Sequence, residues 1–315
     1  MNTVIGIDVS KHSLDCYSSL TNEYKTFPNN EAGIENFIKI YNTLLPFKAI
    51  FESTGCYHRV LHRKLSEAGI EACIVNPYKS RCFAKSAGFL AKTDKVDAKM
   101  LCFYGQKMPI RAIAYLPVAY QELESLCRYR VKLEDDLHRE KAQLELGHHS
   151  TYVNDEIAYQ IKYFKTKIKE IEKRIDDLIQ NTESFKEKQN ILMTVPGIGA
   201  RSIAALLCYL PELGSLNCKQ IIALCGLAPY VCESGQMRGK AMIKGGRAHI
   251  RKALYMPILT SVRINPVISR FYQRLRSKGK PVKVALIACM RKLIKILNFL
   301  VKNKVTWNKI TAPIS

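Results

Sequence analysis

The chain has 315 residues, of which 47% are hydrophobic, so it is long enough for two domains and too apolar to be disordered throughout. Lys and Arg total 49 against 27 Asp and Glu, a net charge of +22, which is typical of an intracellular protein that binds a polyanion. The eleven cysteines show no C-x-x-C or zinc-ligand spacing, which argues against a disulfide framework and predicts free thiols in a reducing cytosol. The sequence has no signal-peptide core and no run of about 18 apolar residues, so we expect no membrane segment.

The positive charge is concentrated in the C-terminal part of the chain. Residues 190–315 contain 21 Lys or Arg but only two acidic residues, Glu212 and Glu233. Such a surface favours binding to nucleic acid over binding to a membrane.

Residues 1–115 alternate short β-rich runs with helical patterns, which predicts an α/β domain with a mixed sheet. The expected strands cover residues 4–9, 14–18, 24–27, 49–52 and 72–75. The expected helices cover residues 34–45, 57–68, 79–89 and 94–104.

Residues 116–188 have the pattern of a coiled coil. Apolar residues recur at alternating spacings of four and three at positions 157, 161, 164, 168, 171, 175 and 178, and a weaker series precedes them. Two helices that turn near residues 147–150 fit this pattern. We favour an arm that joins subunits into a homodimer or homotetramer, because so long an apolar seam needs a partner. The alternative is a hairpin that packs only on itself.

Four carboxylates are candidates for a metal site. Asp8 and Glu52 end two expected strands, and ligands of open sheets gather at the carboxyl ends of strands. Asp94 and Asp97 follow Thr93, a good helix N-cap, and their spacing puts both on one helix face. Four converging acids would repel one another unless they bound a divalent cation such as Mg²⁺, which prefers oxygen ligands and also binds phosphate. Capping or surface roles are the alternative.

Two segments of the basic region are candidate phosphate contacts. In Val195-Pro196-Gly197-Ile198-Gly199, the glycines allow a tight turn between two apolar helices, which predicts a helix-hairpin-helix motif for sequence-independent DNA binding. The second segment, residues 232–251, alternates glycines and cations around Ser234. A serine among cations can attack a phosphodiester, although composition alone favours an ordinary loop serine. The candidate nucleic-acid contacts are Lys11, Gly197, Gly199, Arg238, Lys240, Lys244, Arg247 and Arg251.

A series of short motifs gives the chain a family resemblance. In order, they are Gly6-Ile7-Asp8-Val9-Ser10-Lys11, Glu52-Ser53-Thr54-Gly55, Asn76-Pro77, Lys92-Thr93-Asp94-Lys95-Val96-Asp97-Ala98, Pro196-Gly197-Ile198-Gly199, Gly226-Leu227-Ala228-Pro229, Ser234-Gly235, Gly245-Gly246-Arg247 and Leu254-Tyr255-Met256. Together they resemble the DEDD transposases of insertion sequence family 110 over nearly the whole chain.

The resemblance implies a RuvC-like, RNase H-like domain at residues 1–115, whose tetrad Asp8, Glu52, Asp94 and Asp97 binds Mg²⁺ or Mn²⁺. It implies a subunit-joining coiled coil at 116–188 and a mainly α-helical domain at 189–304 with Ser234 as the catalytic nucleophile; residues 305–315 would form a tail. It also implies donor and target DNA as partners, together with a structured noncoding guide RNA that pairs with both. The expected location is the cytoplasm of a prokaryote, in association with the nucleoid.

The resulting prediction is an RNA-guided transposase that cuts and rejoins DNA by metal-assisted attack of Ser234. Because the acids and the serine lie in different domains, the site would be composite. Two alternatives stay open. A metal-dependent nuclease of the Holliday-junction-resolvase type would use water as the nucleophile and would not need Ser234. A non-enzymatic nucleic-acid-binding protein would tolerate loss of every carboxylate.

Overall fold

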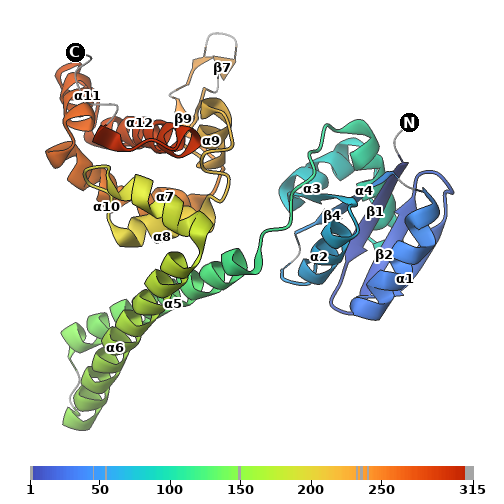
Figure 1. Cartoon of the computed structure of the whole chain (residues 1–315), viewed down its shortest axis with the longest axis horizontal. Helices are drawn as coiled ribbons and strands as arrows, with labels where there is room; N and C mark the ends of the chain where they lie inside the picture. The colour runs from blue at the N-terminus through green and yellow to red at the C-terminus, as the bar shows by residue number, and fades with distance from the viewer. Residues whose placement is uncertain are drawn as a thin grey trace. The chain divides into compact units, whose positions relative to one another are not determined.

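The computed structural model describes residues 3–44, 46–53, 55–147, 150–231, 233–234, 237–239 and 241–308, with the backbone alone at 237 and 238. The chain divides into two compact units, Met1–Leu116 and Pro117–Ser315 (Figure 1). Each unit has its own core and is described by itself.

The first unit is built on a mixed sheet, as predicted. Its strands are β1 (Thr3–Val9), β2 (Ser13–Ser18), β3 (Tyr24–Pro28), β4 (Phe47–Glu52) and β5 (Glu71–Val75), in the order β3-β2-β1-β4-β5. The β1–β2 and β2–β3 pairs are antiparallel, whereas β1–β4 and β4–β5 are parallel. The helices are α1 (Glu31–Tyr41), followed by the 3₁₀ turn η1 (Asn42–Leu44), α2 (Arg59–Glu67), α3 (Pro77–Ser86) and α4 (Asp94–Lys107).

Helices cover both faces of this sheet, which is why its central strands are apolar on both sides. Because side chains alternate along a strand, Ile5 and Ile7 of β1 point to one face and pack with residues of α1 and α2. Val4 and, on β4, Ile50 point to the other face and pack with residues of α4. The sheet is therefore the middle layer between two helical layers (Figure 1).

Glycines bring α4 unusually close to the sheet. A Cβ atom on Gly6 of β1 would lie 2.1 Å from the carbonyl oxygen of Ala98 and 2.3 Å from the backbone nitrogen of Cys102. On α4 itself, a Cβ on Gly105 would lie 2.6 Å from Cγ1 of Ile50. Real Cβ atoms do not approach this closely, so the absence of side chains at both positions sets the distance between α4 and the sheet.

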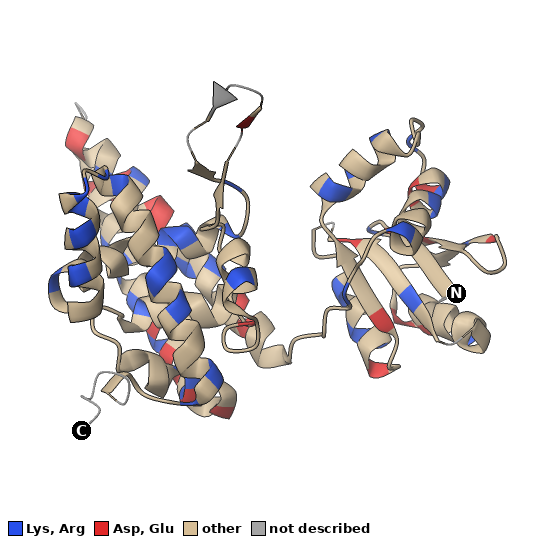
Figure 2. Cartoon of the chain, turned by 90° about the horizontal axis from the view of Figure 1, so that it is seen from above, with Lys and Arg blue, Asp and Glu red and all other residues tan. Residues whose placement is uncertain are grey.

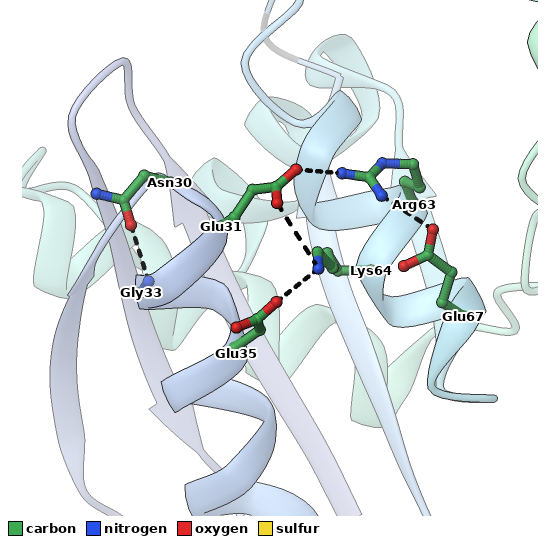
Figure 3. A network of polar contacts seen from close by, with 7 residues as sticks. All are labelled: Asn30, Glu31, Gly33, Glu35, Arg63, Lys64 and Glu67. Carbon is green, nitrogen blue, oxygen red and sulfur yellow. Dashed lines mark hydrogen bonds and ion pairs between the residues drawn. The ribbon is translucent and has the colours of Figure 1, made fainter.

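On the opposite face, ion pairs join α1 to α2 (Figure 3). Arg63 binds Glu31 at 2.6 Å and Glu67 at 3.0 Å, and Lys64 binds Glu35 at 2.6 Å. The hydrogen bond from Lys64 lowers the pKa of Glu35. These carboxylates are exposed, and solvent screens exposed pairs so that they add little to stability. The pairs therefore fix the register of two helices that the core already holds together.

The second unit is mostly helical, as predicted. Its helices are α5 (Val118–Leu146), α6 (Thr151–Asn181), α7 (Glu183–Met193), α8 (Ala200–Tyr209), α9 (Cys218–Leu224), α10 (Ala248–Ile264), α11 (Pro266–Ser277) and α12 (Val282–Asn303). Two short antiparallel pairs lie between α9 and α10: β6 (Pro229–Tyr230) with β9 (Met242–Ile243), and β7 (Glu233–Ser234) with β8 (Met237–Arg238). Among the described residues, no helix is long and apolar enough to cross a bilayer.

The long helices α5 and α6 pack against each other as a hairpin (Figure 1). Of the apolar series on α6, Ile157, Ile161, Ile168 and Ile175 are already at most 8% exposed in the single chain. At the base of the hairpin, Ile175 and Leu123 join the core formed by α7–α12. Packing within the chain, chiefly against α5, therefore buries much of the apolar series on α6 from which dimerisation was predicted.

Candidate active site and nucleic-acid interface

Asp8 and Glu52 lie side by side at the carboxyl edge of the sheet. Ile7 of β1 pairs with Phe51 of β4 in parallel register, so the next residue on each strand is one of the two acids. Alternation along the strands places Asp8 on the face of Gly6, and Glu52 on the face of Ile50, which is the face that α4 covers. Both carboxylates therefore lie on the α4 side of the sheet edge.

Asp94 and Asp97 lie in the first turn of α4. Thr93 caps this helix, because its hydroxyl accepts a hydrogen bond from the backbone nitrogen of Val96 at 3.3 Å. Asp97 is half-buried, whereas Asp94 is exposed. Gly6 and Asp8 lie on the same face of β1, and Gly6 packs against Ala98, the residue after Asp97 on α4. The close packing of α4 on β1 therefore brings Asp97 toward Asp8.

The electrostatics show that these carboxylates act on one another. Burial and, after it, the charges of Asp97, Asp94 and Glu52 together raise the pKa of Asp8 to about 6. Burial also raises the pKa of Asp97, with additions from Glu52 and Asp94 and opposition from Lys92. The charges of the other three predicted acids thus all act on the Asp8 carboxyl.

The chemistry of these groups fits a divalent cation, but their present spacing does not enclose one. Within the described part of the chain, no three His, Cys, Asp or Glu side chains are close enough to hold an ion together. The donor set is nevertheless purely carboxylate, as Mg²⁺ prefers, and its negative charge is uncompensated around Asp8. Metal binding would require these side chains to move closer together.

A fifth carboxylate, Asp15, faces Asp8 across the β1–β2 pair and was missed by sequence reasoning. It is only 4% exposed and accepts hydrogen bonds from the hydroxyls of Tyr24, Thr26 at 2.8 Å and Ser13 at 3.0 Å. These donors satisfy its charge, so it is held in place rather than offered as a ligand. The sequence signal that could have identified Asp15 is its position as an acid between two apolar residues, in Leu14-Asp15-Cys16.

Two further side chains position the edge of the site. Ser80, fully buried on α3, donates a hydrogen bond of 2.5 Å to Oε1 of Glu52. Asn29 donates to the carbonyl oxygens of Ser10 at 2.7 Å and Tyr57 at 3.2 Å, and so joins the β1–β2 turn to the segment after β4. Neither could be assigned from sequence, because both contacts are made between segments far apart in the chain.

Ser234 lies on β7, and Figure 1 shows β7 projecting from the helices of the second unit. It is exposed, and it pairs with Met237 across the β7–β8 ladder. The β6–β9 pair lies below it, with Tyr230 opposite Met242. The serine is therefore accessible to a large substrate.

Arg247 and Arg251 anchor the base of this ribbon. Arg247 forms a two-pronged pair with Glu212, with both nitrogen–oxygen distances 2.7 Å, and donates to the carbonyl of Tyr209 at 2.8 Å. Arg251 donates to the carbonyl of Gly245 at 2.6 Å. Both guanidiniums are thus engaged within the protein, and their contact with nucleic acid remains a prediction.

The glycines at the ribbon base are there for close backbone packing. A Cβ on Gly226 would lie 2.2 Å from the carbonyl oxygen of Gly245, and a Cβ on Gly246 would lie 2.2 Å from the nitrogen of Gly226. All three glycines have positive φ angles between 63° and 69°, which side chains rarely adopt. This packing fixes where the ribbon leaves the helical core.

The other predicted nucleic-acid contacts differ in accessibility. Lys11 and Lys244 are exposed, and a Cβ on Gly199 would meet nothing within 4 Å. Gly197 instead packs on α10, since a Cβ there would lie 2.3 Å from the hydroxyl of the buried Ser261. Lys240 and the side chain of Arg238 lie outside the described residues.

We expect Arg247→Lys and Glu212→Gln each to destabilise the second unit and to do so non-additively. Lysine keeps the charge but loses the fork that binds both carboxylate oxygens. The pair is about one-third exposed, so we expect a coupling energy of about 0.5–1.5 kcal/mol rather than the larger values of buried pairs. Urea unfolding of the two single variants and the double variant measures it. A coupling energy near zero would show that the pair does not anchor the ribbon.

Comparison with known proteins confirms the resemblance. A family model for DEDD transposases of the IS110 type, described as "Transposase", matches residues 5–146, and one described as "Transposase IS116/IS110/IS902 family" matches residues 189–273. The chain is 32% identical over 307 residues to the pilin gene-inverting proteins of Moraxella lacunata and Moraxella bovis, covering 93% of this chain and 94% of each relative. It is 28% identical over 109 residues to an uncharacterized protein of insertion element IS110 from Streptomyces coelicolor, covering 34% of this chain and 27% of that protein. The chain therefore belongs to the IS110 family of transposases.

Proposed function

We propose that this transposase breaks and rejoins DNA strands with Ser234 as the nucleophile and the carboxylates of the first unit as the acid–base and metal-binding groups. The observation that carries the proposal is the electrostatic coupling of Asp8, Glu52, Asp94 and Asp97 at one edge of a sheet. The exposure of Ser234 on an anchored ribbon adds to it. The first unit then corresponds to a RuvC-like domain.

In this mechanism, the Ser234 hydroxyl attacks a DNA phosphorus atom. A bond forms between the serine oxygen and phosphorus, the bond to one deoxyribose oxygen breaks, and that oxygen leaves as a hydroxyl. Attack of another strand's hydroxyl on the phosphoserine ester reverses these steps, so no external energy source is needed. The serine proton requires a base, and no Asp or Glu follows Glu233 in the sequence. We propose that this base is a carboxylate of the first unit.

The carboxylate oxygens of the first unit are suitable ligands for a divalent cation. Asp8, Glu52, Asp94 and Asp97 would hold it, with Mg²⁺ favoured and Mn²⁺ as a substitute. When bound, such a cation neutralises charge on the phosphate and favours the ionised form of a nearby hydroxyl. Ser80 keeps Glu52 oriented toward the site through its hydrogen bond.

The proposal extends to partners and assembly. We propose that a structured noncoding RNA guides the choice of donor and target DNA and that α5 and α6 join subunits into a dimer or tetramer. The exposed Tyr152, Tyr159 and Tyr163 on α6 support a role in assembly, because the apolar surface that α5 leaves uncovered includes them.

We also propose that the turn between α7 and α8 binds a DNA phosphate as a helix-hairpin-helix motif, through the open backbone at Gly199. The names of the Moraxella relatives, which describe inversion of a gene, support rearrangement of DNA segments.

A covalent-adduct assay tests the proposal. The protein, expressed with its element's flanking DNA so that any guide RNA is present, is incubated with Mg²⁺ and labelled donor and target duplexes and run on a denaturing gel. We expect a DNA–protein adduct with wild type and none with Ser234→Ala or Asp97→Ala. Ser125→Ala, which changes an exposed serine on α5, is the matched control and should form the adduct normally. Cleavage without an adduct, unaffected by Ser234→Ala, would instead indicate a metal-dependent nuclease.

A further inference from the structure

A basic cavity lies between α11 and α12, apart from the ribbon that carries Ser234. It has a volume of about 280 Å³ and is lined by Val267, Arg270, Phe271, Arg274 and Lys292. The four lining residues of α11 follow the spacing i, i+3, i+4, i+7, so they share one face of that helix. Lys292 reaches the same place from α12, which packs against α11.

The cavity is arranged around an aromatic ring. The Nζ atom of Lys292 lies 4.7 Å from the centre of the Phe271 ring, and the guanidinium carbon of Arg274 lies 5.2 Å from it. Both distances are within the range of cation–π attraction, which holds the two cations near the half-buried ring. The ring thus orders side chains that would otherwise extend separately into solvent.

The charge of this cavity is not balanced by acids. The sequence from α10 to the end of α12 contains no Asp or Glu. Within the described part of the chain, no carboxylate pairs with Arg270, Arg274 or Lys292, whereas the arginines at 201 and 247 both have glutamate partners. Arg270 uses its Nε atom to bind the carbonyl of Pro266 at 3.2 Å, which leaves its two terminal nitrogens as donors. Figure 2 shows the same predominance of Lys and Arg over the helices of this unit.

The proximity of the cations is costly, and an anion would remove the cost. Burial lowers the pKa of Lys292, and the neighbouring charges of Arg274 and Arg270 lower it further. An anion between them would turn mutual repulsion into three attractions. Guanidinium forks and an ammonium group together are the usual donors to phosphate.

We propose that this cavity binds one phosphodiester group of a nucleic-acid backbone, outside the catalytic site. Its volume lies at the lower limit of ligand pockets, about 300 Å³, which suits a single backbone phosphate rather than a long segment of strand. The lining consists of three cations and two apolar side chains, and cations of this kind supply most contacts to phosphate, so we expect the contact to position the strand. The inference rests on the proposed function only in that the substrate is a nucleic acid, and it is independent of the serine chemistry.

The test compares two charge-matched double variants of the full chain. Arg274→Gln with Lys292→Gln removes two cavity cations; Arg276→Gln with Lys283→Gln removes two exposed cations of the same helices that do not line the cavity. Binding of a short labelled DNA duplex of arbitrary sequence and of an RNA hairpin is titrated at several salt concentrations. We expect the cavity variant to lose about tenfold in affinity, and its slope of log affinity against log salt to become shallower by about 0.9 on duplex DNA, the value for one lost phosphate contact. The control variant should stay within about twofold of wild type and keep its slope.

Each outcome has a defined meaning once thermal unfolding shows that both variants fold like wild type. A loss of affinity by the cavity variant but not by the control variant supports the phosphate site. Whether the loss is seen with DNA, with RNA or with both identifies the nucleic acid that occupies it. Equal losses by the two double variants, or no loss by either, would overturn it, because the cavity would then contribute only net charge. Failure of the covalent-adduct assay would refute the serine mechanism but leave this comparison unchanged.

Discussion

Asp8→Asn is expected to reduce DNA strand cleavage by about a thousandfold or more while the first unit stays folded. Asparagine keeps the shape of the side chain but removes the charge on which acid–base work and cation binding at this edge depend. Loss of such a group costs several kcal/mol of transition-state stabilisation, and each 1.36 kcal/mol is about tenfold in rate. Cleavage of a labelled duplex under single-turnover conditions measures the loss.

The same substitution is expected to raise the stability of the first unit near pH 7 in the absence of divalent cations. The pKa of Asp8 is raised to about 6 in the folded protein, above its value in the unfolded chain, so its ionised form destabilises the fold. The destabilisation by ionised Asp8 is absent below about pH 4 and fully present above about pH 6. After a discount for partial solvent exposure, we expect Asn to stabilise by about 1–2 kcal/mol at pH 7 and by little at pH 4.

The neighbouring Asp15→Asn variant is the control for that claim. Asp15 accepts three hydroxyl hydrogen bonds and is buried, so an amide there mispairs a donor and destabilises the fold. Opposite signs of the two changes in urea unfolding are therefore expected. Added Mg²⁺ should raise the thermal unfolding midpoint of wild type but not of Asp8→Asn. If Asp8→Asn lowered the stability at pH 7, this would contradict the claim that the ionised Asp8 carboxylate destabilises the fold.

Gly6→Ala is expected to destabilise the first unit by about 3 kcal/mol or more and to abolish cleavage. The added methyl would overlap backbone atoms of Ala98 and Cys102, which cannot move aside as a flexible side chain can. The whole of α4 would have to shift away from β1, and Asp94 and Asp97 would shift with it. Urea unfolding measures the first effect, and the cleavage assay measures the second.

Gly199→Ala is the matched control for this prediction. Its φ angle is −108°, and its Cβ would meet nothing within 4 Å. We expect its stability to stay within about 1 kcal/mol of wild type. If Gly6→Ala were equally mild, the close approach of α4 to β1 would not be what positions Asp97.

The sequence predicted the mixed sheet because each strand carried its own signal. The β1 run is apolar on both faces and has an acid as its penultimate residue, and the β5 run is followed by Asn76-Pro77, where the asparagine caps α3. The grouping of Asp8 with Glu52 could also be anticipated, since both lie at or next to the carboxyl end of a strand. What could not be derived was the pairing register, and so the position of Asp15 opposite Asp8 was missed.

Contacts between distant segments are what the sequence pattern could not supply. A glycine that binds phosphate and one that lets backbones pack look alike in a sequence, so the packing of Gly197 on Ser261 was not anticipated. The pairing of Arg247 with Glu212 was not anticipated because the two residues lie 35 positions apart in the chain. Periodicity alone also does not say how much of the apolar series on α6 is buried within the same chain, and its contact with another subunit stays a prediction.

Identification of the residue that carries DNA tests the central claim most directly. The covalent adduct is digested with nuclease and trypsin, and the peptide of residues 220–238 is sequenced by mass spectrometry for a remaining nucleotide. This peptide contains one serine, Ser234, and one other phenolic or aliphatic hydroxyl, that of Tyr230. We predict the nucleotide on Ser234. A nucleotide on Tyr230, or one on a residue outside this peptide, would contradict the serine mechanism.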